Sequence, residues 1–107
     1  MVTLDQTASG TEIAVRPEEL IVVNLRETPT TGFRWTLVSQ GEPACTLDHD
    51  TFEPKNDGAG RGGTRRWTFR ASPAGRGTIE LAERRPWERD EPPVQTFTLG
   101  VRVDVHA

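Results

Sequence analysis

The pattern that most constrains the fold of this chain is a strict two-residue alternation near its C-terminus. Apolar side chains occupy every second position there, namely Phe97, Leu99, Val101, Val103 and Val105. Successive side chains of a β-strand point to opposite faces, so this pattern predicts a strand with one buried face. No stretch keeps apolar residues at helical spacing over three turns. The sequence therefore predicts an all-β protein.

Shorter runs of the same kind predict further strands. They are residues 13–15, 35–37, 45–47, 67–71 and 79–81, whereas residues 20–23 are a continuous apolar run that predicts a strand buried on both faces. The segments between them hold many of the 10 glycines and 8 prolines, which favour turns. Such a series is typical of a β-sandwich or barrel, and two sheets with Greek-key connections suit this length. We expect one domain over residues 1–107, an all-β sandwich of seven or eight antiparallel strands.

Aliphatic residues are scarce, so aromatic side chains must supply much of the core. Leu, Ile, Val and Phe together number 23 of the 107 residues. That share is close to the level of about 20% below which charged chains tend to stay disordered. We expect the sandwich to be held chiefly by Trp35, Trp67, Phe69 and Phe97. Trp87 lies in a charged segment, where an indole either faces a partner or folds back over the sandwich.

Charge and cysteine content disfavour several classes of partner. The chain has 13 basic and 16 acidic residues with no block of like charges, which disfavours nucleic acid and membrane surfaces as partners. Cys45 is the only cysteine, and with His49 and His106 it cannot complete a four-ligand zinc site unless carboxylates supply the missing ligands. We therefore expect no metal, no other cofactor and a monomeric protein.

The N-terminal residues show no targeting pattern. The first thirty positions lack a basic segment followed by an apolar stretch of signal-peptide length. No apolar run reaches the length of a membrane span. We expect the chain as given to be cytoplasmic, or secreted if a leader was removed.

Two of the loops contain glycine in unusual settings. In the first loop, residues 28–33, Pro29 fixes φ and Gly32 permits a positive φ, but a plain turn has no special use for the two threonines between them. In the second loop, residues 58–64, the glycines match the dinucleotide pattern G-x-G-x-x-G. That pattern requires a helix after it, and a predicted strand follows instead, so a hairpin loop is the better interpretation.

The third loop, residues 85–87, places Trp87 among charged side chains. In an immunoglobulin-like sandwich, a first loop between strands B and C and a third loop between the last two strands emerge at the same end. Binding residues commonly gather on such loops. We therefore expect the three loops to form one surface.

These three loops, in this order and spacing, resemble the signatures of the chagasin family of cysteine-protease inhibitors. The family motifs N-P-T-T-G-[FY]-x-W, G-x-G-G and R-P-W correspond to residues 28–35, 60–63 and 85–87. The similarity extends from about residue 20 to residue 105. It implies an immunoglobulin-like β-sandwich that reversibly inhibits papain-like cysteine proteases and contributes no catalytic residue.

The resemblance also implies that the three loops plug the active-site cleft of the protease. The tip of the first loop would lie over the catalytic Cys–His pair, the second loop along the non-primed side, and the third loop on the primed side. The implied protease-binding residues are Pro29, Thr30, Thr31, Gly32, Phe33, Gly60, Arg61, Gly62, Gly63, Arg85, Pro86 and Trp87.

Thr28 departs from the motif, since the family usually has Asn there, which forms an Asx-turn more readily than Thr. Glu27 and Arg34 lie outside the signature and are expected to be solvated.

Two other functions compete with inhibition on the residues alone. An exposed tryptophan on a sandwich loop also suits an immunoglobulin-like carbohydrate- or protein-binding module, because fold does not fix function. An enzyme is disfavoured, because Cys45 lies in a predicted strand and no Ser-His-Asp arrangement is evident. Sugar binding does not need the sequence Thr30-Thr31-Gly32, which favours the inhibitor.

Overall fold

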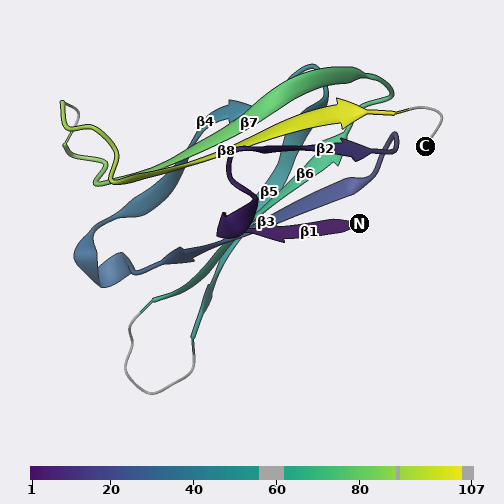
Figure 1. Cartoon of the computed structure of the whole chain (residues 1–107). Coiled ribbons are helices and arrows are strands. Elements are labelled where there is room, and N and C mark those ends of the chain that lie inside the picture. The colour runs from purple at the N-terminus through teal and green to yellow at the C-terminus, as the bar shows by residue number, and fades with distance from the viewer. Residues whose placement is uncertain (56–61, 89, 105–107) are drawn as a thin grey trace.

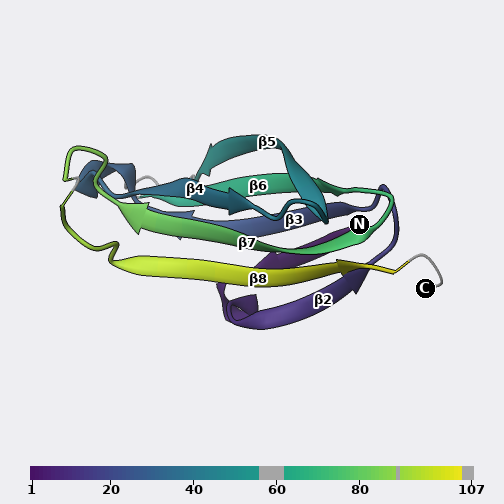
Figure 2. The ribbon, with the colours of Figure 1, turned by 90° about the horizontal axis from the view of Figure 1, so that it is seen from above.

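Two four-stranded sheets face each other in the computed structural model, which describes residues 1–55, 62–88 and 90–104 (Figures 1 and 2). The strands are β1 (Val2–Asp5), β2 (Thr11–Val15), β3 (Leu20–Glu27), β4 (Arg34–Gln40), β5 (Cys45–Pro54), β6 (Gly63–Ala71), β7 (Gly75–Arg84) and β8 (Gln95–Val103). Two short 3₁₀ turns are η1 (Gln6–Ala8) and η2 (Pro29–Thr31). One sheet has the order β1-β3-β6-β5 and the other β2-β8-β7-β4. The predicted sandwich is confirmed, with eight strands in the described part of the chain.

The sheets are mixed rather than wholly antiparallel. Four strand pairs are antiparallel, namely β3–β6, β5–β6, β4–β7 and β7–β8. The pairs β1–β3 and β2–β8 are parallel, so the expectation of antiparallel pairing throughout is wrong at these two sheet edges. A hairpin imposes antiparallel pairing only on consecutive strands that are neighbours in a sheet. Because β1, β2 and β3 alternate between the two sheets, no hairpin joins them to one another.

The core is built on the aromatic side chains that the alternation placed inward. Trp35, Trp67, Phe69 and Phe97 are all buried, as predicted. Along β8, alternate residues from Phe97 to Val103 are buried as well, whereas Val105 lies outside the described residues. These side chains pack with Ile21, Val23, Leu25, Ile79 and Leu81 in one cluster between the sheets. The few apolar side chains are therefore concentrated in one layer between the two sheets.

The β3–β4 and β7–β8 connections lie at one end of the sandwich, opposite the end at which β8 finishes (Figures 1 and 2). The last residue of β3, Glu27, pairs with Gly63, which in turn pairs with Pro54 at the end of β5. The base of the second loop therefore lies at this end too, beside the start of the first loop, whereas residues 56–61 lie outside the described residues. Among the residues described, no helix has the length and apolar character needed to cross a membrane.

Candidate functional site

The first loop is a 3₁₀ turn closed by a left-handed glycine. Pro29 begins η2, where its fixed φ suits a helical start. The N–H of Thr31 donates to the carbonyl of Thr28 at 3.1 Å, and the N–H of Gly32 donates to that of Pro29 at 2.9 Å. Gly32 has φ 83°, a region that residues with a Cβ rarely adopt. The sequence Pro-Thr-Thr-Gly thus specifies one compact turn rather than an extended segment.

The side chain of Thr31 stabilises this turn from within. Its hydroxyl donates to the Thr28 carbonyl at 2.7 Å and accepts from the Phe33 N–H at 3.3 Å. The Thr28 side chain makes no capping hydrogen bond to η2. Thr30 and Thr31 are both exposed. In the free chain the hydroxyl proton of Thr31 is therefore already donated to the Thr28 carbonyl.

The third loop packs directly on the first. Trp87 is 67% exposed, yet its ring lies so close to Gly32 that a Cβ at that position would be 2.5 Å from the indole Cη2. The Arg85 Nε donates to the Thr31 carbonyl at 3.1 Å, and the Arg85 guanidinium lies 4.4 Å from the centroid of the Phe33 ring. The Trp87 ring of this same molecule therefore leaves no room for a side chain at position 32.

The rest of the third loop supports this contact. Pro86 is exposed between Arg85 and Trp87. The Arg85 Nη1 also donates to Glu88 Oε1 at 3.2 Å. Arg85 is half-buried and joins the third loop to the first. Its main role in the free chain is therefore to hold these two loops together.

The second loop can be placed only at its base. Gly60 and Arg61 lie outside the described residues. Gly62 is buried with φ 87°, and a Cβ there would lie 2.8 Å from the Glu27 carbonyl oxygen and 2.9 Å from Thr28 Oγ1. Gly63 is the first residue of β6. The base of the second loop therefore abuts the start of the first.

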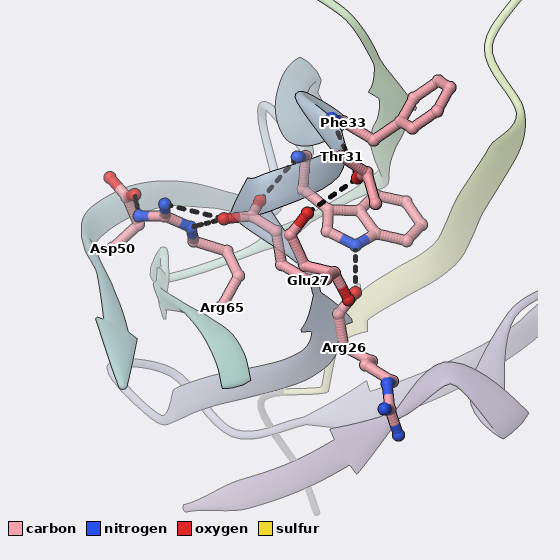
Figure 3. Close-up of polar contacts among 8 residues, drawn as sticks. Arg26, Glu27, Thr31, Phe33, Asp50 and Arg65 are labelled. Atoms are coloured by element: carbon pink, nitrogen blue, oxygen red, sulfur yellow. Dashed lines mark hydrogen bonds and ion pairs between the residues drawn. The ribbon is translucent and has the colours of Figure 1, made fainter. Parts of the chain in front are cut away.

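Glu27 lies at the base of the first loop, and the sequence interpretation placed it wrongly. It was expected to be solvated, but it is 1% exposed, and its carboxylate forms an ion pair with Arg65 at 2.9 Å (Figure 3). Arg34 is exposed, as expected. The missed signal is the alternation itself, because Glu27 follows Ile21, Val23 and Leu25 in the inward phase of β3.

Two ionisable groups have pKa values displaced by burial. Burial raises the pKa of the Glu83 carboxyl on β7, and the negative charge of Glu27 raises it further. Burial also raises the pKa of the Cys45 thiol to about 11. Within the described residues, no cluster of three or more His, Cys, Asp or Glu side chains could hold a metal ion.

Cys45 is expected to be unreactive in the folded protein. Its Sγ is buried and lies 3.3 Å from the Gln40 carbonyl oxygen, and a thiol with a pKa of about 11 is almost wholly protonated at neutral pH. The thiolate is the nucleophile in disulfide exchange. A chromogenic aromatic disulfide should therefore label Cys45 only after denaturation, as followed by thiol release. Equally fast labelling of native and denatured chains would contradict this.

Comparison with known proteins connects this loop arrangement to one family. A family model described as chagasin family peptidase inhibitor I42 matches residues 14–101. Chagasin from Trypanosoma cruzi is 29% identical over 101 residues, covering 90% of this chain and 92% of that protein. Amoebiasin-2 from Entamoeba histolytica is 29% identical over 86 residues, covering 78% of this chain and 69% of that protein.

The fold is also similar to a solved structure. The crystal structure of the cysteine protease inhibitor EhICP2 from Entamoeba histolytica matches with a TM-score of 0.84 and 26% identity. The match covers 96% of this chain and 95% of that one. The alternative of a carbohydrate-binding module is not favoured by these matches.

Proposed function

This chain belongs to the chagasin family of peptidase inhibitors, and we propose that it inhibits papain-like cysteine proteases by inserting the first and third loops, with the second beside them, into the active-site cleft. Because the family is one of inhibitors, the prediction that the chain is not an enzyme is confirmed. Family membership shows that the chain is a peptidase inhibitor, and how its loops act is what we propose.

The contact between Trp87 and Gly32 is the observation that carries this proposal. It makes the first and third loops one continuous surface with a small turn beside a large exposed ring. A narrow turn suits entry into a cleft, and an exposed tryptophan suits packing on the surface beside it. Gly62 and Gly63, which abut the start of the first loop, would extend this surface, and we propose that Gly60 and Arg61, outside the described residues, bind the protease with them.

In this arrangement the turn at Pro29, Thr30 and Thr31 lies over the catalytic Cys–His pair of the protease. Thr30 offers an exposed hydroxyl at the tip, whereas the Thr31 hydroxyl holds the turn in shape. Arg85 holds the turn through the Thr31 carbonyl and lies over the Phe33 ring, and Pro86 connects Arg85 to Trp87. The inhibitor supplies no reacting group, so binding depends on shape, on hydrogen bonds and on the buried area, which is about 800 Å² per partner in a standard interface.

The compact turn also explains why the protease would not cut it. Cleavage requires the scissile carbonyl to reach the attack geometry at the catalytic thiolate. The hydrogen bonds from Thr31 and Gly32 back to Thr28 and Pro29 hold the backbone of the first loop in a 3₁₀ turn, and Gly32 then reverses its direction. A carbonyl held in this turn is not presented as an extended substrate would present it.

Titration of papain with the purified chain tests this function. We expect loss of activity that returns on dilution, with the chain recovered at its full mass by mass spectrometry. A serine protease, which lacks the Cys–His pair, serves as the control and should keep its activity. Cleavage of the chain in step with turnover would identify it as a substrate and contradict the proposal.

A further inference from the structure

Glu27 presents a buried charge that the loops themselves do not explain. It is the last residue of β3, it is 1% exposed, and it lies where the inward positions of the strand are otherwise apolar. Burying a carboxylate is strongly unfavourable unless it is paired and hydrogen-bonded. The position therefore requires a specific set of partners.

Those partners lie on both sides of the first loop. Glu27 Oε2 accepts from the backbone N–H of Trp35 at 2.8 Å (Figure 3). The indole Nε1 of Trp35 donates to the carbonyl of Arg26 at 2.9 Å. Residues 26 and 27 precede the loop and residue 35 follows it, so two side-chain to backbone bonds close the loop at its base. The end of β3 and the start of β4 are therefore held at a fixed separation, which fixes the base of the turn between them.

The same carboxylate is tied to the strands that carry the second loop. Glu27 Oε1 accepts from Arg65 Nε at 3.2 Å and from Arg65 Nη2 at 2.9 Å, a two-bond contact to β6 (Figure 3). Arg65 Nη1 donates to Asp50 Oδ2 on β5 at 3.1 Å. The Arg65 guanidinium also lies 5.3 Å from the centroid of the Phe52 ring on β5. β5 and β6 flank the second loop, so Glu27 joins the bases of two loops.

We propose that Glu27, held by Arg65, is a positioning residue for inhibition: it fixes the shape of the first loop and its placement relative to the second. This inference rests on the proposed function. A buried ion pair adds little net stability compared with a well-packed apolar pair, so geometry is the better explanation of its presence. A loop already held in its bound shape loses less conformational entropy on binding and resists cleavage.

The variant that tests this is Glu27→Gln. The amide keeps the size of the side chain and an acceptor for the Trp35 N–H, but it removes the charge that holds Arg65. Because the Arg65 contact no longer holds this side chain in place, it should release the Trp35 N–H more often, and the Trp35 amide hydrogen should exchange faster by NMR. We expect the folded variant to inhibit papain about tenfold more weakly, since the loop must then be ordered on binding, and to be cut within residues 28–33.

Two matched variants separate positioning from stability. Glu12→Gln removes a half-exposed glutamate on β2 that forms ion pairs with Arg76 and Arg102 away from the loops. Val15→Ala lowers stability by removing buried apolar surface from the same strand. At a temperature at which both are folded, both should inhibit papain as the wild-type chain does and remain uncut. An inhibition loss that merely follows the unfolding temperature across all variants would overturn the proposal.

Three other results would contradict the positioning role of Glu27 or the proposed function. A folded Glu27→Gln chain that inhibits as tightly as the wild type and stays uncut contradicts the positioning role. If Glu27→Gln does not fold, Arg65→Lys replaces it, since lysine keeps the charge but not the two-bond contact, and unchanged inhibition again contradicts the role. If the wild-type chain itself does not inhibit papain, the proposed function is wrong, and unchanged exchange of the Trp35 amide in a folded variant then contradicts the positioning role separately.

Discussion

Replacing Trp87 with alanine is expected to weaken inhibition of papain by about 2 kcal/mol or more, which corresponds to an inhibition constant about 30-fold higher. Tryptophan in the centre of an interface commonly carries this much binding energy. The ring is 67% exposed in the free chain, so its removal should leave the unfolding temperature almost unchanged. Loss of inhibition without loss of stability would therefore place Trp87 in the interface.

Val38→Ala is the matched control for Trp87→Ala. Val38 is also an exposed apolar side chain, but it lies within β4 rather than in a loop. Inhibition constants and thermal unfolding are measured for both variants and for the wild-type chain. The control should inhibit normally. If Trp87→Ala also inhibits normally while its fold is intact, Trp87 is not part of the binding surface.

Gly32→Ala is expected to reduce inhibition at least as strongly as Trp87→Ala, for two reasons. An alanine at φ 83° is strained by on the order of 1–2 kcal/mol. Its Cβ would also lie 2.5 Å from Cη2 of Trp87, so the indole must move away. One methyl group would thus distort the first loop and displace the third, and the inhibition constant of the folded variant measures both effects.

Gly10→Ala and a double-mutant cycle separate these two effects. Gly10 has φ 87°, a Cβ added there would meet nothing within 4 Å, and the residue lies outside the three loops, so Gly10→Ala carries the backbone strain alone. It should lower stability but leave inhibition unchanged. In a Trp87→Ala background, Gly32→Ala should lose much of its effect on inhibition, because the displaced ring is absent. Strict additivity of the two substitutions would show that the ring contact is unimportant.

Much of the fold could be predicted from the apolar pattern. Strands β2 and β4 to β8 each contain an alternating run, β3 contains the continuous apolar run of residues 20–23, and the inward positions of Trp35, Trp67 and Phe97 follow from the alternation. β1 was not predicted, because four residues with two apolar positions are too short a signal. Most of β5 was missed because its register shifts between Leu47 and His49, and such an irregularity breaks the two-residue period.

The residues that shape the first and third loops could be recognised in the sequence, but the residues that support these loops could not. Pro29, Gly32 and Trp87 are recognisable because proline, glycine and exposed tryptophan have special roles in short motifs. Glu27 was assigned to solvent because its charge was given more weight than its place in the alternation. Arg65 occupies the inward phase of β6, two residues before Trp67. Opposite charges in the inward phase, at the end of β3 and near the start of β6, could have indicated the pair.

The contact of Arg85 with the Thr31 carbonyl could not have been foreseen in the same way. It joins residues far apart in the sequence, and it depends on how the β7–β8 connection lies over the β3–β4 connection. No local pattern encodes a bond from a side chain to a backbone carbonyl of another loop. The parallel pairing of the first two strands is also a property of the whole topology rather than of any segment.

That topology has a consequence for the order in which the chain can acquire its structure. β1 pairs with β3 soon after it along the chain, but β2 pairs with β8, where Thr11 is opposite Leu99. During synthesis from the N-terminus, β2 must wait for almost the entire chain before its sheet partner exists. Closing so long a loop is entropically unfavourable and slows folding. β2 is therefore among the last strands to pair, and its pairing with β8 completes the second sheet.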